Sequence, residues 1–177
     1  MKRGLIVLLV IAGLMLATGC SSSSKRATTS GSDSVASTTG STAASSGFPG
    51  ARGCSAPSAD AIGSAWGVTI TKSTPTADSG CLWEAGSLSQ SVQVSYPPLS
   101  EFPSVRVNIL HSGTVTDITI PGATVAFIKL VLQIGGHTNR VAYVIYPTGV
   151  VQVAVGGPDS IVTDSTVLAI TKVIVGV

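Results

Sequence analysis

Apolar runs rich in β-branched residues, separated by turn sequences, fill the second half of the chain and predict antiparallel strands. Two of the turn sequences are Pro121-Gly122 and Pro147-Thr148-Gly149, and the second predicts a hairpin. A third, Gly156-Gly157-Pro158, is expected to end the sheet. The predicted strands in this half are 115–120, 123–132, 141–146 and 150–155.

The first half of the folded region predicts three shorter strands, at 68–71, 81–85 and 91–96. In the last of these, Val92, Val94 and Tyr96 alternate with polar residues and therefore share one face. Turn residues separate the first two strands, at Thr74-Pro75 and Asp78-Ser79-Gly80.

A helix is predicted at each end of these strands. The first spans 59–66, because Ser58 can cap it and Gly67 provides a stop. Its apolar face is formed by Ile62, Ala65 and Trp66. The last helix is expected to begin at a cap formed by Asp159 or Ser160 and to reach Val173, although its β-branched residues leave a strand as the alternative. Its predicted inward residues are Ile161, Leu168, Ile170 and Ile174.

The segment from Pro97 to His111 is ambiguous. A short helix over 104–110 is favoured, but the alternation of Val105, Val107 and Ile109 also fits a strand.

Strands bracketed by helices predict an α+β fold, with a curved antiparallel sheet and the N-terminal and C-terminal helices packed on it. Both alternating faces of 125–132 and 141–146 are largely apolar, whereas a sheet covered on one side should have one polar face. We expect the segment 97–111 to bury the second face. The alternative is an apolar surface that contacts a lipid or a protein.

Residues 1–20 have the order of an export signal followed by a lipidation site. Lys2 and Arg3 precede an apolar run from Leu5 to Leu16, which is too short for a membrane-spanning helix. The sequence Ala17-Thr18-Gly19 leads into Cys20 and resembles the bacterial lipobox, so Cys20 is the predicted lipidation site. Acyl chains on this cysteine would anchor the protein to the membrane. The alternative is a soluble secreted protein.

Residues 21–49 are predicted to be a disordered tether. Ser, Thr, Gly and Ala make up 23 of these 29 residues, which leaves too little apolar surface to fold. A flexible coil of this length spans on the order of 30 Å. Some of its threonines could be glycosylated. The predicted organisation is therefore a signal peptide at 1–19, a lipidated Cys20 and tether at 20–49, and one domain at 50–177.

Charge gives no indication of a nucleic-acid partner. The chain has 10 basic and 8 acidic residues, and removal of Lys2 and Arg3 with the signal leaves the mature chain neutral. Only 10% of the residues are charged, which agrees with extensive apolar burial.

The chain has three cysteines. If Cys20 carries lipid in an oxidising compartment, Cys54 and Cys81 remain to form a disulfide that closes a loop of 28 residues. On the chain-entropy model such a bond contributes roughly 3.6 kcal/mol. The alternative, a redox pair of free thiols, lacks the close sequence spacing of such motifs.

Three features together resemble a family of actinobacterial, notably mycobacterial, cell-envelope lipoproteins that carry a domain of unknown function. These features are a cysteine before a short helix that ends in Gly, the sequence Cys81-Leu82-Trp83, and the later segment 115–123. The resemblance covers about residues 50–177. It implies an α+β fold and a cell-surface lipoprotein, and it brings no catalytic residues.

The sequence contains no standard catalytic, nucleotide-binding or metal-binding motif, so no enzyme activity, cofactor or metal is expected. A hydrolase site of His137 with Asp159 or Asp164 is the alternative that spacing leaves open, because triads assemble in space. A metal site of His111, His137 and Asp117 would lack the usual ligand spacing.

Scattered side chains complete the set of candidates. The carboxylates Asp78, Glu84, Glu101 and Asp117 form no evident pair. The aromatic residues are expected mainly in the core, and the possible partner or ligand surface is formed by Trp83, Tyr96, Tyr143 and Tyr146. We therefore expect a non-enzymatic binding or scaffolding module of the cell envelope, held at the outer face of the plasma membrane. A lipid or glycolipid carrier is the alternative.

The lipobox generates the first prediction. Cys20→Ala removes the thiol that would be acylated, so the protein should leave the membrane fraction or remain unprocessed. Cell fractionation followed by immunoblotting measures this. A variant that fractionates with membranes like the wild type would contradict the anchor.

Overall fold

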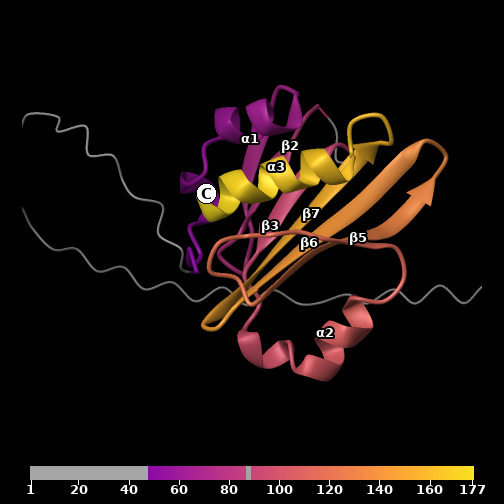
Figure 1. Ribbon diagram of the computed structural model, residues 1–177. Coiled ribbons are helices and arrows are strands. Elements are labelled where there is room, and N and C mark those ends of the chain that lie inside the picture. Colours follow the sequence, from indigo (N-terminus) through magenta and orange to yellow (C-terminus); the bar gives the residue numbers. More distant parts are fainter. Residues whose placement is uncertain (1–47, 87–88) are drawn as a thin grey trace, which may run out of the picture. The chain divides into compact units, whose positions relative to one another are not determined.

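The computed structural model describes residues 48–86 and 89–177, which form one seven-stranded antiparallel sheet with helices on both faces (Figure 1). The strand order is β1-β2-β3-β7-β6-β5-β4, so β1 and β4 lie at the two edges. The α+β class and the curved, open sheet predicted from the sequence are confirmed. The strands are β1 (Lys72–Pro75), β2 (Cys81–Glu84), β3 (Ser91–Ser95), β4 (Val115–Asp117), β5 (Val125–Ile134), β6 (His137–Tyr146) and β7 (Gly149–Pro158). The helices are α1 (Ala59–Trp66), α2 (Ser104–Leu110) and α3 (Asp164–Val175), with short 3-10 turns η1 (Gly53–Ser55) and η2 (Leu99–Glu101).

The main core lies between the sheet and the pair α1 and α3, which pack on each other over one face. Alternate residues of the central strands point into it, as their period of two requires. Ile62 and Trp66 of α1 enter this core as predicted. The strand residues in it include Trp83, Val92, Val94, Val144, Val151 and Val153.

A second, smaller core covers the opposite face of the sheet, on the side of α2. The ring of Phe102, which precedes α2, is tilted by 51° relative to the Tyr143 ring at a centroid distance of 6.2 Å. The Arg106 guanidinium lies 4.7 Å from the centroid of the Phe102 ring. Val107 and Leu110 of α2 pack on the same cluster. The prediction that the segment 97–111 buries the second apolar face is therefore confirmed, and its central part is a helix.

Helix α1 has the predicted boundaries. The Ser58 hydroxyl accepts a hydrogen bond from the Ala61 amide at 3.2 Å, and Gly67 ends the helix with a φ of 78°. Gly63 permits the chain to fold back closely, because a Cβ there would lie 2.6 Å from the carbonyl oxygen of Val68.

Helix α3 begins later than predicted. Its N-cap is Thr163, whose hydroxyl accepts from the Thr166 amide at 3.2 Å, and not Asp159 or Ser160. The Asp159 carboxylate instead accepts hydrogen bonds from Thr138 and Gln133. Ile170 and Ile174 are buried as predicted, whereas Ile161 precedes the helix.

One strand prediction and one turn prediction in the first half are wrong. Residues 68–71 are not a strand, and the first strand is β1, which includes the predicted turn residues Thr74 and Pro75. An edge strand accommodates proline because the missing amide donor would face outward.

The second half of the sheet differs from prediction mainly in strand length. Strand β4 ends at Asp117, whereas β5 and β6 extend to a turn at Gly135-Gly136. Strand β7 continues through Gly157 to Pro158, so the glycines do not end the sheet. A Cβ at Gly157 would lie 3.0 Å from Val162, which shows that this glycine allows the chain after β7 to pack against the sheet.

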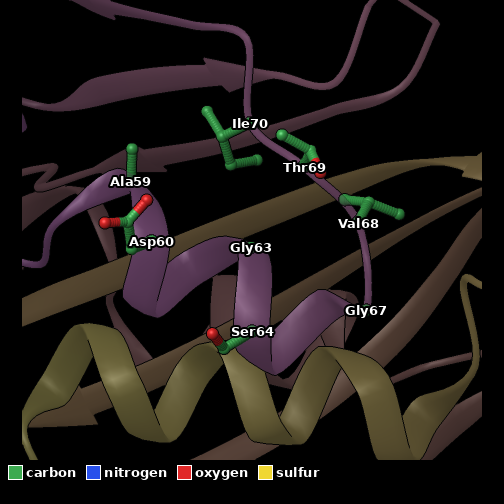
Figure 2. Close-up of a pocket in the computed structure, with 8 residues that line it drawn as sticks. All are labelled: Ala59, Asp60, Gly63, Ser64, Gly67, Val68, Thr69 and Ile70. Carbon is green, nitrogen blue, oxygen red and sulfur yellow. The ribbon is translucent and has the colours of Figure 1, made fainter.

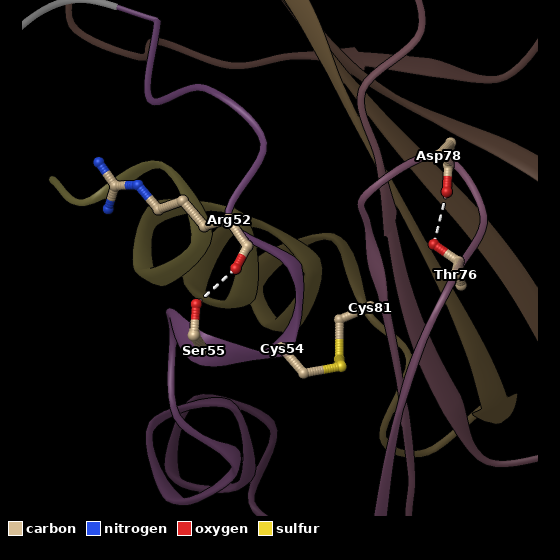
Figure 3. The surroundings of a disulfide bond; sticks show 6 residues. All are labelled: Arg52, Cys54, Ser55, Thr76, Asp78 and Cys81. Atoms are coloured by element: carbon tan, nitrogen blue, oxygen red, sulfur yellow. Dashed lines mark hydrogen bonds between the residues drawn. A yellow bond between two sulfur atoms is a disulfide. The ribbon is translucent and has the colours of Figure 1, made fainter. Parts of the chain in front are cut away.

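The predicted disulfide between Cys54 and Cys81 is present (Figure 3). It joins η1 to the first residue of β2, with a Cα–Cα distance of 4.9 Å. A backbone hydrogen bond of 2.9 Å from Gly53 to Ser79 reinforces the same junction. The bond thereby fixes the segment that leads into α1 against the sheet.

Phe48, the first described residue, lies within the segment predicted as tether and packs on the sheet. Its ring makes edge contacts with Tyr146 at 5.9 Å and Tyr96 at 6.3 Å between centroids. Gly149 creates the space, because a Cβ there would lie 2.6 Å from the Phe48 ring. The chain therefore enters the domain at the β6–β7 turn.

The disulfide generates the second prediction. The double variant Cys54→Ser/Cys81→Ser should lower the melting temperature by roughly 10–20 °C, because the unfolded chain regains the entropy of an open loop. Thermal unfolding followed by circular dichroism measures this, and reduced wild type is the matched control. Equal melting temperatures for the oxidised protein and the double variant would contradict a stabilising role.

Candidate functional site

The aromatic residues predicted as a possible partner surface do not form one. Trp83 and Tyr146 are fully buried in the main core, and Tyr143 is buried in the core under α2. Tyr96 is partly buried against Phe48. Burial raises the pKa of Tyr143 and Tyr146 above the ordinary tyrosine value. The prediction of an aromatic partner surface is therefore wrong, because these rings pack in the apolar cores on the two faces of the sheet.

The residues of the alternative hydrolase site have other partners. His137 is exposed at the start of β6, and Asp159 accepts from the side chains of Thr138 and Gln133. Asp164 pairs with Arg140 at 2.5 Å. Within the described region, no hydrogen bond joins His137 to either carboxylate.

The three residues of the alternative metal site are divided. His111 Nε2 lies 2.5 Å from Asp117 Oδ1, and the His111 ring packs edge-on against Phe127. His137 is the first residue of β6, whereas Asp117 is the last residue of β4. Within residues 48–86 and 89–177, no group of three or more His, Cys, Asp or Glu could hold a metal ion.

The four predicted carboxylates are also separate in the structure. Glu84 is buried and pairs with Lys72 at 3.1 Å, and Glu101 lies 3.9 Å from Arg106. Asp78 accepts from the Thr76 hydroxyl at 2.5 Å (Figure 3). Each therefore serves a local contact.

An open hollow of about 570 Å³ lies beside α1 (Figure 2). Asp60 and Ser64 line it from the helix, and Val68, Thr69 and Ile70 line it from the returning chain. Its shape follows from the close approach of this chain to Gly63. Asp60 is the one ionisable group among its lining residues, so the hollow offers no group of side chains for catalysis.

The most distinctive surface is the end of the β5–β6 hairpin, which we call the hairpin pole and define as Val131, Leu132 and Ile134. Its three aliphatic side chains are 55%, 52% and 68% exposed, respectively. Figure 1 shows this hairpin extending beyond the helices. Exposed aliphatic residues gathered at one end of a domain are typical of an interaction site.

Strand register places most of the hairpin pole on the α2 side of the sheet. Residues 141, 143 and 145 of β6 belong to the core under α2, so Asn139 and His137, which continue this alternation, point to the same side. Leu132 pairs with Asn139 and Ile134 pairs with His137. Since directly opposed residues share a face, Leu132 and Ile134 also lie on the α2 side.

A shallow groove of about 210 Å³ lies beside the hairpin pole, lined by Leu132 of β5 and by residues of β3, β6 and β7. Gly156 forms part of its floor between Ser91 and Asn139, with which it is paired in the sheet. The buried Asn139 Oδ1 has no hydrogen-bond partner among the described residues. The groove therefore combines an unsatisfied polar atom with the aliphatic side chain of Leu132, a combination that suits a peptide or another amide-containing ligand.

Asp159 fixes the hairpin to the turn that follows β7. Its carboxylate accepts from the Thr138 hydroxyl and from Gln133 Nε2 at 3.2 Å, and its amide donates to the Gly136 carbonyl at 2.9 Å. The hydrogen bonds from Thr138 and Gln133 lower the pKa of Asp159 below its ordinary value. The aliphatic side chains are thus presented on a braced hairpin.

The hairpin pole and Phe48 lie at opposite ends of the same strands. Phe48 contacts Tyr146 at the last residue of β6, and His137 is the first residue of that strand. Ten residues of extended chain span about 30 Å. Phe48, the first described residue, therefore lies at the end of β6 remote from the exposed aliphatic residues.

Sequence reasoning missed the hairpin pole because the predicted strands ended at Leu132 and began again at Val141. The signal present in the sequence was Gly135-Gly136, a turn pair between Ile134 and His137. Both glycines have positive φ values, 60° and 79°.

Comparisons identify no relative of this chain. No family model matches the sequence, and no curated protein or solved structure gives a significant match. Among the described residues, no helix has the length and apolar character needed to cross a membrane.

The Asp159 brace generates the third prediction. Because its folded-state pKa is lowered, the ionised carboxylate stabilises the fold above the ordinary value of 3.8, and this stabilisation is lost as the pH falls below that value. Asp159→Asn should therefore lower the urea midpoint at neutral pH and reduce the further loss on acidification. Urea unfolding at a series of pH values measures this. Glu101→Gln is the matched control, since its ion pair is exposed and loose. Identical pH profiles for Asp159→Asn and wild type would contradict the brace.

Proposed function

We propose that this protein is a lipid-anchored, non-enzymatic binding or scaffolding module of the cell envelope, with the hairpin pole as its contact surface. The lipobox before Cys20 and the Ser- and Thr-rich tether support the anchor. The disulfide between Cys54 and Cys81 supports an oxidising compartment outside the cytoplasm. The resemblance to actinobacterial envelope lipoproteins remains a prediction consistent with this function.

One observation carries the proposal: the exposed aliphatic residues lie at the end of the domain opposite the tether. Phe48 enters at the β6–β7 turn, about 30 Å from the hairpin pole. A tether that spans on the order of 30 Å would lift the domain from the bilayer and leave this pole facing outward. Val131, Leu132 and Ile134 would then be available to an envelope partner.

The carrier alternative has less support. It needed an open apolar sheet face, and Phe102 with α2 covers the face concerned. The polar groove beside the hairpin pole is too small, at about 210 Å³, to enclose an acyl chain together with a headgroup. Adducts with lipid in the experiment below would favour the carrier.

The fourth prediction concerns contacts in intact cells. A photo-reactive amino acid at position 134 should cross-link the full chain to defined envelope components, because Ile134 is exposed at the proposed contact surface. The same group at Thr148 is the matched control, since that residue is exposed on the β6–β7 turn near the tether. Immunoblotting and mass spectrometry of the adducts measure the difference.

A second variant separates binding from catalysis. His137→Ala should leave the position-134 adducts unchanged, because a few apolar anchors dominate interface energies. Equal adducts from positions 134 and 148 would contradict the proposed contact surface. Loss of all adducts on His137→Ala, with abundance unchanged, would favour chemistry at His137.

A further inference from the structure

The outer edge of β5 is open at the hairpin pole. Strand β4 pairs with Phe127–Lys129 of β5, and the Thr114 carbonyl accepts from the Leu130 amide at 3.0 Å. Beyond that point, no described strand pairs with the outer side of β5, which continues to Ile134. Backbone donors and acceptors at such an edge can form hydrogen bonds with another extended chain.

The open segment, residues 131–134, lacks the charged and proline residues that usually protect an edge strand, although a β-bulge lies at its start. It contains no charged residue and no proline, and its Val131, Leu132 and Ile134 side chains are more than half exposed. The opposite edge of the sheet is different, because β1 carries Lys72, with 65% of its side chain exposed, and Pro75. Lysine and proline are the residues that prevent strand pairing at edges.

We propose that the outer edge of β5 pairs with the same edge of a second copy of this chain, in antiparallel orientation. A neutral segment opposed to itself brings no like charges together, so its own copy is a suitable partner. A two-fold contact of this kind is closed and limits assembly to a dimer. The proposal rests on the proposed function, since it names the partner that meets the hairpin pole.

The extent of pairing is limited by a β-bulge. The register between β5 and β6 shifts between Leu130 and Leu132, which makes Val131 an extra residue in β5. A bulge increases local twist, so the new pairing is confined to the few residues around Leu132–Ile134. Such a short contact is weak in dilute solution, and confinement of both copies to one membrane raises their effective concentration.

The geometry identifies how the two copies must be aligned. Directly opposed residues of an antiparallel pair point to the same face, and a two-fold axis perpendicular to the sheet preserves faces. One residue of the segment must therefore lie on the axis, opposite its own copy. Its two Cβ atoms would be about 4.5–5.5 Å apart, close to the separation that a disulfide bridges.

Variants of the full chain that each carry one introduced cysteine, oxidised in intact cells, test this alignment. Val131→Cys, Leu132→Cys, Gln133→Cys and Ile134→Cys are compared with Val105→Cys, which lies on α2 and is 71% exposed. Cys54 and Cys81 are bonded to each other, and Cys20 carries the proposed lipid, so the native cysteines should not compete. One of the four positions should give about tenfold or more disulfide dimer than its neighbours and than Val105→Cys. Non-reducing gels and mass spectrometry measure the dimer.

Lysine at two of Val131, Leu132 and Ile134, chosen to leave the reporting cysteine in place, should then abolish dimer formation at that position. Ile109→Lys, a matched change on exposed α2, should not. Three results would overturn the self-pairing: equal dimer yields at all four positions, no dimer at any of them, or a dimer that still forms in the charge variant. If position-134 photo-adducts contain another component and no second copy, the proposed binding module stands and the self-pairing is wrong. If Cys20→Ala leaves membrane attachment unchanged while the dimer forms, the self-pairing stands and the lipid anchor fails.

Discussion

The structure depends on the two central strands, β6 and β7, which are apolar on both faces. Val144 and Val151 point toward α1 and α3, while Tyr143 and Val150 point toward α2. Both faces must be removed from water, and burial of such side chains contributes about 1.5–3 kcal/mol each. This requirement explains why α2, a helix of seven residues with no side-chain cap, remains on the sheet: Phe102 and the buried rings beneath it hold it there.

The two ends of the central strands differ in how much of them is covered by other parts of the domain. At the β6–β7 turn, Phe48 packs on Tyr146 in the space left by Gly149, and the disulfide holds the nearby segment before α1. At the other end, β5 and β6 extend beyond both helix layers and are braced by Asp159. Phe48 and the hairpin pole are therefore separated along the length of β6. The proposed function uses this separation.

Local sequence signals located the helices more accurately than the strand ends. Ser58 and Gly67 defined α1, because capping and left-handed backbone are properties of single residues. The start of α3 was misplaced because several polar residues near it could serve as a cap, and the packing of Asp159 against Thr138 removed one of them. Pro75 was assigned to a turn, since its place at a sheet edge cannot be known before the strand order is known.

The sequence by itself determined the fold class, the disulfide partners and the presence of two apolar faces, because each depends on residue type and period. Tertiary structure alone decided which surfaces remain exposed. Trp83 and Tyr146 looked suited to a contact surface and are buried, whereas Val131 and Ile134 looked like ordinary strand residues and are exposed. The physical reason is that exposure depends on what covers a residue. The outer edge of β5 is paired only as far as β4 extends along it, and this limit is set by pairing between strands that are separate in sequence.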